Sequence, residues 1–175
     1  VRIRSGRGYV SYPFQLTVPK NIERPPLFLY LSFFPLSSAE IVEEIIDNGF
    51  AVARVSYQDI AADQNDGFQN GPGILFPGNA YDSWGKLGVW AWGLSRIMDY
   101  LVQEETIDAG RVAVVGHSRL GKAALLCGAM DDRFSLVIAC ESGAGGAALF
   151  RGKEGENVAD LCRNFPYWFC GNFKK

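Results

Sequence analysis

One segment constrains the fold of this chain more than any other, because it joins two apolar stretches through a serine with glycines nearby. Residues 111–126 read Arg-Val-Ala-Val-Val-Gly-His-Ser-Arg-Leu-Gly-Lys-Ala-Ala-Leu-Leu. This pattern predicts a β-strand that turns sharply into an α-helix, with Ser118 at the turn. Small residues permit a tight turn, and the N-terminus of the following helix favours negative charge. We therefore predict that Ser118 is a nucleophile.

The match to the general Gly-x-Ser-x-Gly motif is imperfect. Leu120 occupies the place of the second glycine, and Gly121 follows one position later. A serine with a purely structural role in a strand-to-helix turn is therefore the alternative. The apolar strand before Ser118 and the apolar helix after it favour the nucleophile.

The first third of the chain predicts a strand–helix–strand unit. Residues 27–31 are apolar throughout, as expected of a strand that is covered on both faces in a parallel sheet. Ser37 and Glu40 have the spacing of a capping box at the start of a helix, and a second apolar strand follows at residues 50–55. The order is that of a βαβ unit.

The rest of the chain continues this alternation. A long polar, glycine-rich loop at residues 58–79 is of the kind that could overhang a site. Apolar positions at steps of three and four then predict a helix running to about Glu105. A strand at residues 112–115, a helix at 120–129 and a strand at 136–140 complete an α/β pattern with right-handed connections. We expect one domain across residues 1–175.

Composition narrows the function classes. The chain has 17 basic and 19 acidic residues, for a net charge of −2, which gives no basic excess that would recommend a nucleic-acid partner. The longest apolar run, residues 27–36, falls short of the roughly 20 residues that span a bilayer. Four cysteines follow no metal-binding spacing, and with a single histidine we expect no metal. Buried thiols and disulfides both remain open.

The single histidine, His117, precedes Ser118 directly and is a poor candidate for its general base. Adjacent residues around such a turn point in different directions, whereas a base must reach the serine oxygen. Glu141 follows the strand at residues 136–140, at the sheet edge where α/β proteins place their ligands. We predict that Glu141 is the acid that orients a catalytic histidine, with a solvated or capping carboxylate as the alternative.

Two cations follow the serine. Arg119 offers its backbone N–H, and in addition its guanidinium, to a developing oxyanion. Lys122 lies one helical turn beyond Ser118 and can face the same cleft. Together they would suit a substrate rich in oxygen atoms, such as a carboxyl derivative of a sugar. Solvent-facing cations on a helix are the alternative for both.

Several separate motifs, in one order, resemble the glucuronoyl esterases of carbohydrate esterase family 15. The likeness covers roughly residues 26–175 and is strongest at residues 84–96, 116–122, 141–148 and 165–173. The Gly-x-Ser-Arg-x-Gly-Lys element of that family accounts for the displaced glycine. The resemblance implies an α/β-hydrolase fold, which is a three-layer sandwich with a mostly parallel sheet, incomplete here at its C-terminal side.

The resemblance also implies roles for individual residues. Ser118 matches the nucleophile and Arg119 the oxyanion stabiliser, while Lys122 matches a residue that bonds hydroxyls of the uronate. Glu141 matches the catalytic acid that some members carry, and Glu156 resembles a position that some members use for sugar contact. The catalytic histidine of the family would lie beyond the end of this chain, so the isolated chain would be inactive.

The implied reaction is hydrolysis of esters between 4-O-methyl-glucuronate side chains of xylan and lignin alcohols, through an acyl-enzyme on the serine. No cofactor is implied. Members of the family are secreted or periplasmic, and we expect the complete protein to be a monomer without nucleic-acid or membrane partners. Two alternatives stand beside this hypothesis: another carbohydrate esterase, specific for acetyl or feruloyl groups, and a catalytically inactive fragment.

Overall fold

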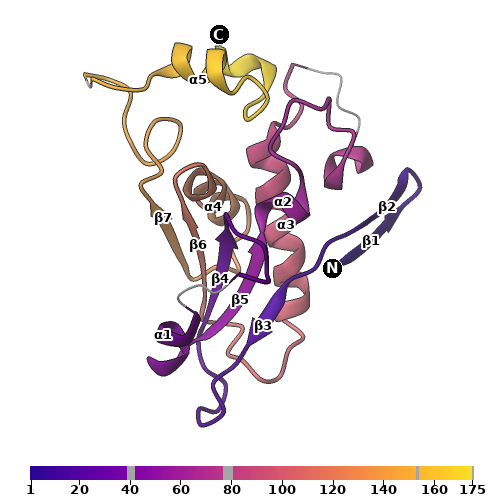
Figure 1. Ribbon diagram of the computed structural model, residues 1–175, viewed down its shortest axis with the longest axis vertical. Helices are drawn as coiled ribbons and strands as arrows, with labels where there is room; N and C mark the ends of the chain where they lie inside the picture. Colours follow the sequence, from indigo (N-terminus) through magenta and orange to yellow (C-terminus); the bar gives the residue numbers. More distant parts are fainter. Residues whose placement is uncertain (39–41, 77–80, 153, 175) are drawn as a thin grey trace.

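A five-stranded sheet forms the centre of the protein in the computed structural model, which describes residues 1–38, 42–76, 81–152 and 154–174 (Figure 1). The strand order is β3-β5-β4-β6-β7. The strands, in this spatial order, span Gln15–Thr17, Ala51–Ser56, Leu27–Ser32, Val112–His117 and Leu136–Cys140. All pairs are parallel except β3 with β5, so the prediction of a mostly parallel sheet is confirmed.

Burial follows the apolar pattern of the central strands. All six residues of β5 are buried, and the leucines of β4 at positions 27, 29 and 31 are buried as well. Such strands need cover on both faces of the sheet. The apolar residues 27–31 thus predicted a strand covered on both faces, and β4 is the middle strand of the sheet.

Helices α1 (Val42–Asp47), α3 (Lys86–Leu101) and α4 (Arg119–Met130) connect the parallel strands. The chain moves one way across the sheet from β4 to β5, and the other way from β5 to β6 and on to β7. Because such crossovers are right-handed, α1 belongs on one face, and α3 and α4 belong together on the other. The result is the three-layer arrangement that we predicted. The capping box proposed for α1 includes Glu40, which lies outside the described residues.

The structure differs from the sequence-based expectation in three places. Helix α3 ends at Leu101 rather than near Glu105, because the next residue, Val102, is exposed and the apolar stripe stops there. The loop after β5 contains a short helix α2 (Tyr57–Ile60) and a 3-10 turn η1 (Gly71–Leu75). A hairpin of β1 (Arg2–Ser5) and β2 (Gly8–Ser11), together with β3, precedes the first predicted strand.

The tail of the chain lies above the C-terminal end of the sheet and contains α5 (Val158–Asn164) and η2 (Gly171–Lys174) (Figure 1). Helix α5 begins with a capping box, in which Asn157 and Asp160 exchange side-chain and backbone hydrogen bonds. Phe165 and Trp168 follow the helix and stack face to face, with 3.7 Å between their ring centroids. The backbone N–H groups of Lys86 and Leu87 donate to tail carbonyls at 2.9 and 3.2 Å, which fixes the tail to the start of α3.

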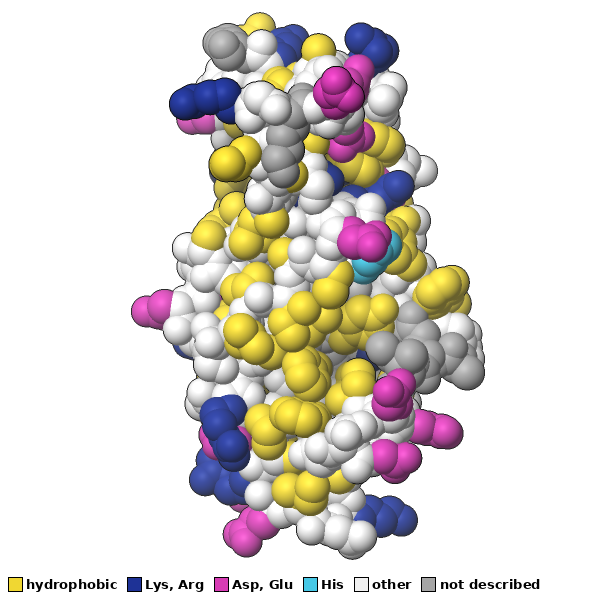
Figure 2. All heavy atoms as spheres, turned by 90° about the vertical axis from the view of Figure 1, so that its left-hand side faces the viewer, with side chains coloured by type: hydrophobic (Ala, Val, Ile, Leu, Met, Phe, Trp, Pro, Cys, Tyr) yellow, Lys and Arg dark blue, Asp and Glu magenta, His cyan; other side chains and the backbone are white. Residues whose placement is uncertain are grey.

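The far side of the sheet is open. Within the described residues, β7 pairs only with β6. Leu136 at its start is 55% exposed, and hydrophobic side chains gather on this side of the molecule, below the single histidine (Figure 2).

All four cysteines are free thiols, so the disulfide alternative does not hold in this structure. Burial raises the pKa of the Cys127 thiol to about 12. Among the described helices, none has both the length and the apolar character that crossing a bilayer requires.

Candidate active site

The turn at Ser118 has the geometry of a nucleophile elbow. Ser118 stands between β6 and α4 with φ 54° and ψ −123°, a region that residues other than glycine rarely adopt. Two backbone hydrogen bonds hold it there: its N–H donates to the carbonyl of Cys140 at 2.9 Å, and its carbonyl accepts from the N–H of Lys122 at 3.1 Å. The predicted strand-to-helix turn is confirmed, and the catalytic role of Ser118 stays a prediction.

The glycines around the elbow have a steric reason. A Cβ atom on Gly116 would lie 2.2 Å from the carbonyl oxygen of Leu120, and one on Gly121 would lie 2.8 Å from that of Cys140. Both glycines therefore let backbone segments pass closer than any side chain allows. Leu120 is fully buried in the core. The glycine of the general motif is displaced because Leu120 packs there and the close contact falls on Gly121.

Arg119, at the start of α4, is held on several sides. Its guanidinium carbon lies 4.7 Å from the ring centroid of Trp168 and 5.5 Å from that of Phe165, both in the tail. The Arg119 Nη1 donates to the Asp63 carboxylate at 2.5 Å. The alternative of a freely solvated cation therefore does not describe Arg119.

Glu141 lies beside the elbow, because His117 at the end of β6 pairs with Cys140 at the end of β7. Its carboxylate contacts the His117 ring, with 3.0 Å between Oε2 and Nε2. Both side chains are exposed, Glu141 to 82% and His117 to 50%. Among the described residues no hydrogen bond joins His117 to Ser118, and the exclusion of His117 as the base stays a prediction.

Lys122 is buried rather than solvent-facing, with 7% of its surface exposed. Its ammonium group donates to the carbonyl of Ser142 at 2.6 Å. Burial lowers the pKa of Lys122, while the negative charge of Glu156 opposes this shift. Glu156 is exposed in the loop before α5. The carboxylate of Glu156 thus stabilises the positive charge of Lys122, and both are predicted substrate-binding residues.

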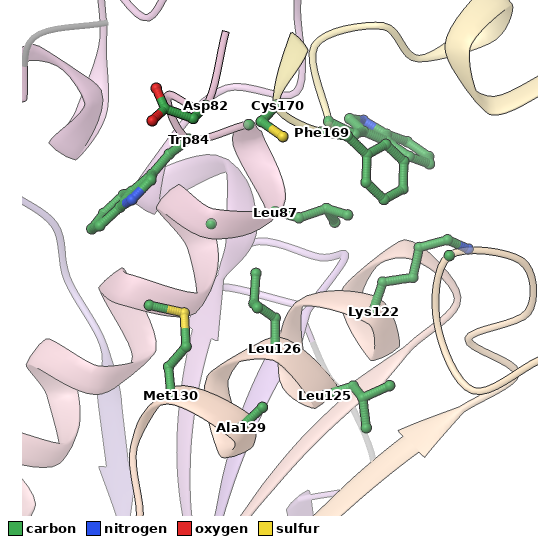
Figure 3. A pocket seen from close by; sticks show the side chains of 14 residues that line it. Asp82, Trp84, Leu87, Lys122, Leu125, Leu126, Ala129, Met130, Phe169 and Cys170 are labelled. Carbon is green, nitrogen blue, oxygen red and sulfur yellow. The ribbon is translucent and has the colours of Figure 1, made fainter. Parts of the chain in front are cut away.

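An apolar cavity of about 460 Å³ lies next to Lys122, between α3, α4 and the tail. Figure 3 shows Leu125, Leu126 and Met130 on α4 below it, with Phe169 and Cys170 of the tail above. Leu87 lines it from the first turn of α3 and Trp84 from the segment before that helix, and Lys122 lies at its edge (Figure 3). Ser118 is not among its lining residues, so the cavity neighbours the elbow without including it.

Sequence reasoning missed Asp63. This carboxylate comes from the loop after β5, and both of its oxygens are bonded, one to Arg119 and the other to the indole N–H of Trp168 at 2.8 Å. The only signal in the sequence was the length of that loop, which predicted that it could overhang a site. The site therefore joins an elbow serine, a clamped arginine and an exposed glutamate at the C-terminal end of the sheet.

Comparison with known proteins identifies the family that this arrangement represents. A family model described as "Glucuronyl esterase, fungi" matches residues 1–174. The chain belongs to this glucuronyl esterase family. Among curated relatives, this chain is 40% identical over 146 residues to "Carbohydrate esterase MZ0003" from an unknown prokaryotic organism, covering 75% of this chain and 32% of the relative. It is 42% identical over 123 residues to 4-O-methyl-glucuronoyl methylesterase 1 of Sodiomyces alcalophilus, covering 65% and 24%.

Solved structures agree with the family and the fold. The glucuronoyl esterase from Solibacter usitatus superposes with a TM-score of 0.84 at 37% identity, over 93% of this chain and 51% of that one. A serine-to-alanine mutant from Sporotrichum thermophile, in complex with methyl 4-O-methyl-beta-D-glucopyranuronate, gives a TM-score of 0.78 at 27% identity, over 98% and 47%. The chain thus spans about half the length of these structures, and about a third or less of the curated relatives.

Proposed function

We propose that the protein containing this chain is a serine esterase that hydrolyses 4-O-methyl-glucuronoyl esters, the bonds that link glucuronoxylan to lignin alcohols. The observation that carries the proposal is the strained Ser118 elbow with the clamped Arg119 beside it. Family membership and the uronate ester in the complex of the Sporotrichum relative support the substrate class.

In the proposed mechanism the Ser118 oxygen attacks the ester carbonyl carbon as a base takes its proton. The negative charge that develops on the carbonyl oxygen is stabilised by the backbone N–H and the guanidinium of Arg119. The base then returns the proton to the leaving alcohol, which leaves a uronoyl ester on Ser118. Water, activated by the same base, releases the uronate and restores the serine.

The proposed base is a histidine outside these 175 residues, oriented by Glu141. His117 is the only histidine in the chain, and its position before Ser118 disfavours a role as base. The exposed Glu141 carboxylate has room for a second partner beside His117. An acid of this kind holds the imidazole in the required tautomer and stabilises the imidazolium.

Lys122 and Glu156 are the proposed contacts for the uronate hydroxyls. A partly desolvated ammonium group and a nearby carboxylate offer a donor and an acceptor to a sugar ring. The proposal requires no cofactor. Because the substrate is a polymer of the plant cell wall that cannot enter a cell, we propose a secreted or periplasmic enzyme, and a monomer when complete.

A test uses the full-length gene product and its Ser118→Ala variant on a methyl ester of 4-O-methyl-glucuronate. Ser118→Ala should lower kcat by at least about a thousandfold. The matched control is Ser11→Ala, which removes an exposed serine at the end of β2 and should leave turnover unchanged.

The same assay separates the alternatives. Activity on acetylated xylan or feruloyl esters without activity on the glucuronate ester would establish a different carbohydrate esterase. If the full-length protein folds but shows no Ser118-dependent turnover on any of these esters, the proposal of a serine esterase is wrong.

A further inference from the structure

A single buried carboxylate connects the long loop, the elbow and the tail. Asp63 lies three residues after α2, and only 4% of its side chain is exposed. We infer that Asp63 is a positioning residue that fixes the Arg119 guanidinium for oxyanion stabilisation. The inference rests on the proposed esterase function and adds to it a residue from a distant loop.

Both carboxylate oxygens of Asp63 are committed. Oδ2 accepts from Arg119 Nη1 at 2.5 Å, and Oδ1 accepts from the indole nitrogen of Trp168 at 2.8 Å. A buried carboxylate is costly unless it is paired and hydrogen-bonded, and here it is both. The backbone of Asp63 is also held, because its N–H donates to the Gln58 side chain at 3.0 Å. Asp63 is therefore a fixed anchor for Arg119.

Three aromatic rings also surround the Arg119 guanidinium. Besides Trp168 and Phe165, the ring of Phe33 lies 5.9 Å from the guanidinium carbon. Trp168 has two roles, since its ring faces the arginine while its N–H binds the same carboxylate. Cation–π contacts with desolvated rings favour the charged guanidinium in this position.

The hydrogen bonds leave one part of the guanidinium available. Nη1 is used by Asp63, and Nε is buried without a hydrogen-bond partner. Nη2 makes no hydrogen bond within the described residues. Unlike Nε, it is not fully buried. Nη2 can therefore donate to an oxygen of the substrate while Asp63 holds the other end of the group.

Holding the arginine in advance matters for catalysis. An unrestrained arginine has many rotamers, and ordering it only in the transition state would raise the barrier. Donors that are already in place stabilise the developing charge without such reorganisation. Loss of the anchor should therefore lower kcat more than it changes KM.

The same loop supplies a matched control. Asp66 is also largely buried and pairs with the buried Lys86, with 2.8 Å between Oδ1 and Nζ. This ion pair holds the loop to the start of α3 and contacts neither Arg119 nor Trp168. Asp66→Asn therefore reports the effect of loosening the loop alone.

The experiment is a double-mutant cycle in the full-length gene product, with kcat, KM and melting temperature measured on the glucuronate ester. Asp63→Asn keeps the shape of the side chain and removes its charge, and we expect kcat to fall about tenfold or more with KM changed less than about threefold. In the Arg119→Ala background, Asp63→Asn should lower kcat no further. Asp66→Asn should lower the melting temperature and keep kcat.

The outcomes are separable. Additive effects of Asp63→Asn and Arg119→Ala, or equal losses of kcat in Asp63→Asn and Asp66→Asn, would overturn the role of Asp63 and leave the esterase function intact. Absence of Ser118-dependent turnover in the parent protein would remove both. If Asp63→Asn does not fold, the same cycle is run with Asp63→Glu, which keeps the charge and displaces it by one methylene; it should also lower kcat only when Arg119 is present.

Discussion

The two sides of the Ser118 elbow are built differently. On one side, Arg119 is enclosed by a buried carboxylate and aromatic rings. On the other side, Glu141 is 82% exposed, and its carboxylate contacts the His117 ring, with 3.0 Å between Oε2 and Nε2. The proposed oxyanion residue, Arg119, is therefore enclosed within this chain, and the proposed catalytic acid, Glu141, is exposed.

The sheet explains this difference. Strand β6, which leads into Ser118, lies between β4 and β7, whereas β7, which leads into Glu141, pairs on one side only within the described residues. A central strand is held by two ladders of hydrogen bonds, and an edge strand by one. The site thus spans the boundary between the core of this chain and its open edge.

The largest effect should come from filling the tight contact at the elbow. Gly116→Ala would place a Cβ atom 2.2 Å from the Leu120 carbonyl oxygen, and we expect it to cost more than about 4 kcal/mol of folding free energy. Gly143→Ala, on the open side, has its nearest contact at 3.8 Å and should cost about 1 kcal/mol, for its positive φ alone. Chemical denaturation of the full-length protein measures both, and similar losses would contradict the contrast.

A second pair of variants tests the open side. Glu141→Gln should lower kcat by about a hundredfold or more, because the neutral amide cannot stabilise an imidazolium. His117→Gln should change kcat by less than about threefold, as expected of an exposed residue outside the chemistry. Both variants alter the same 3.0 Å contact between His117 and Glu141. Equal losses of kcat would therefore show that the effect comes from this contact and would contradict an acid role for Glu141.

Lys122 should show a smaller effect, on binding. Lys122→Met keeps an apolar stem of similar length and removes the ammonium group, so we expect KM for the glucuronate ester to rise about tenfold, with kcat within about threefold. Steady-state kinetics on the full-length protein measures this. An unchanged KM would show that Lys122 does not bind the substrate and only donates its hydrogen bond to the Ser142 carbonyl.

The smallest expected effect is a pH dependence of stability. Burial lowers the pKa of Lys122 below its unfolded value of 10.5. Between the folded and the unfolded pKa the unfolded chain binds more protons, so the contribution of Lys122 to stability becomes more favourable as pH rises through that interval. As pH rises towards 10.5, the difference in unfolding free energy between wild type and Lys122→Met should therefore change in favour of the wild type. A difference that does not change with pH would contradict the burial of a charged group.

The parts of the fold that the sequence predicted are those with a short-range pattern. The apolar strands at 27–31 and 112–115 and the stripe of α3 all lie near their expected places. The hairpin of β1 and β2 escaped prediction, since two four-residue strands leave too short an alternation to detect. The helix and 3-10 turn in the loop at 58–79 were hidden by its polar, glycine-rich composition.

The sequence by itself determined the elbow, because the strand, the serine and the helix that make it are consecutive and the steric need for Gly116 and Gly121 is local. Only the tertiary structure decided how Arg119 is held. Asp63 lies 56 residues before Arg119 and 105 before Trp168. A carboxylate in a polar loop has the same sequence signature whether it is solvated or buried, and only packing of the loop and the tail over the end of the sheet makes it the anchor of the arginine.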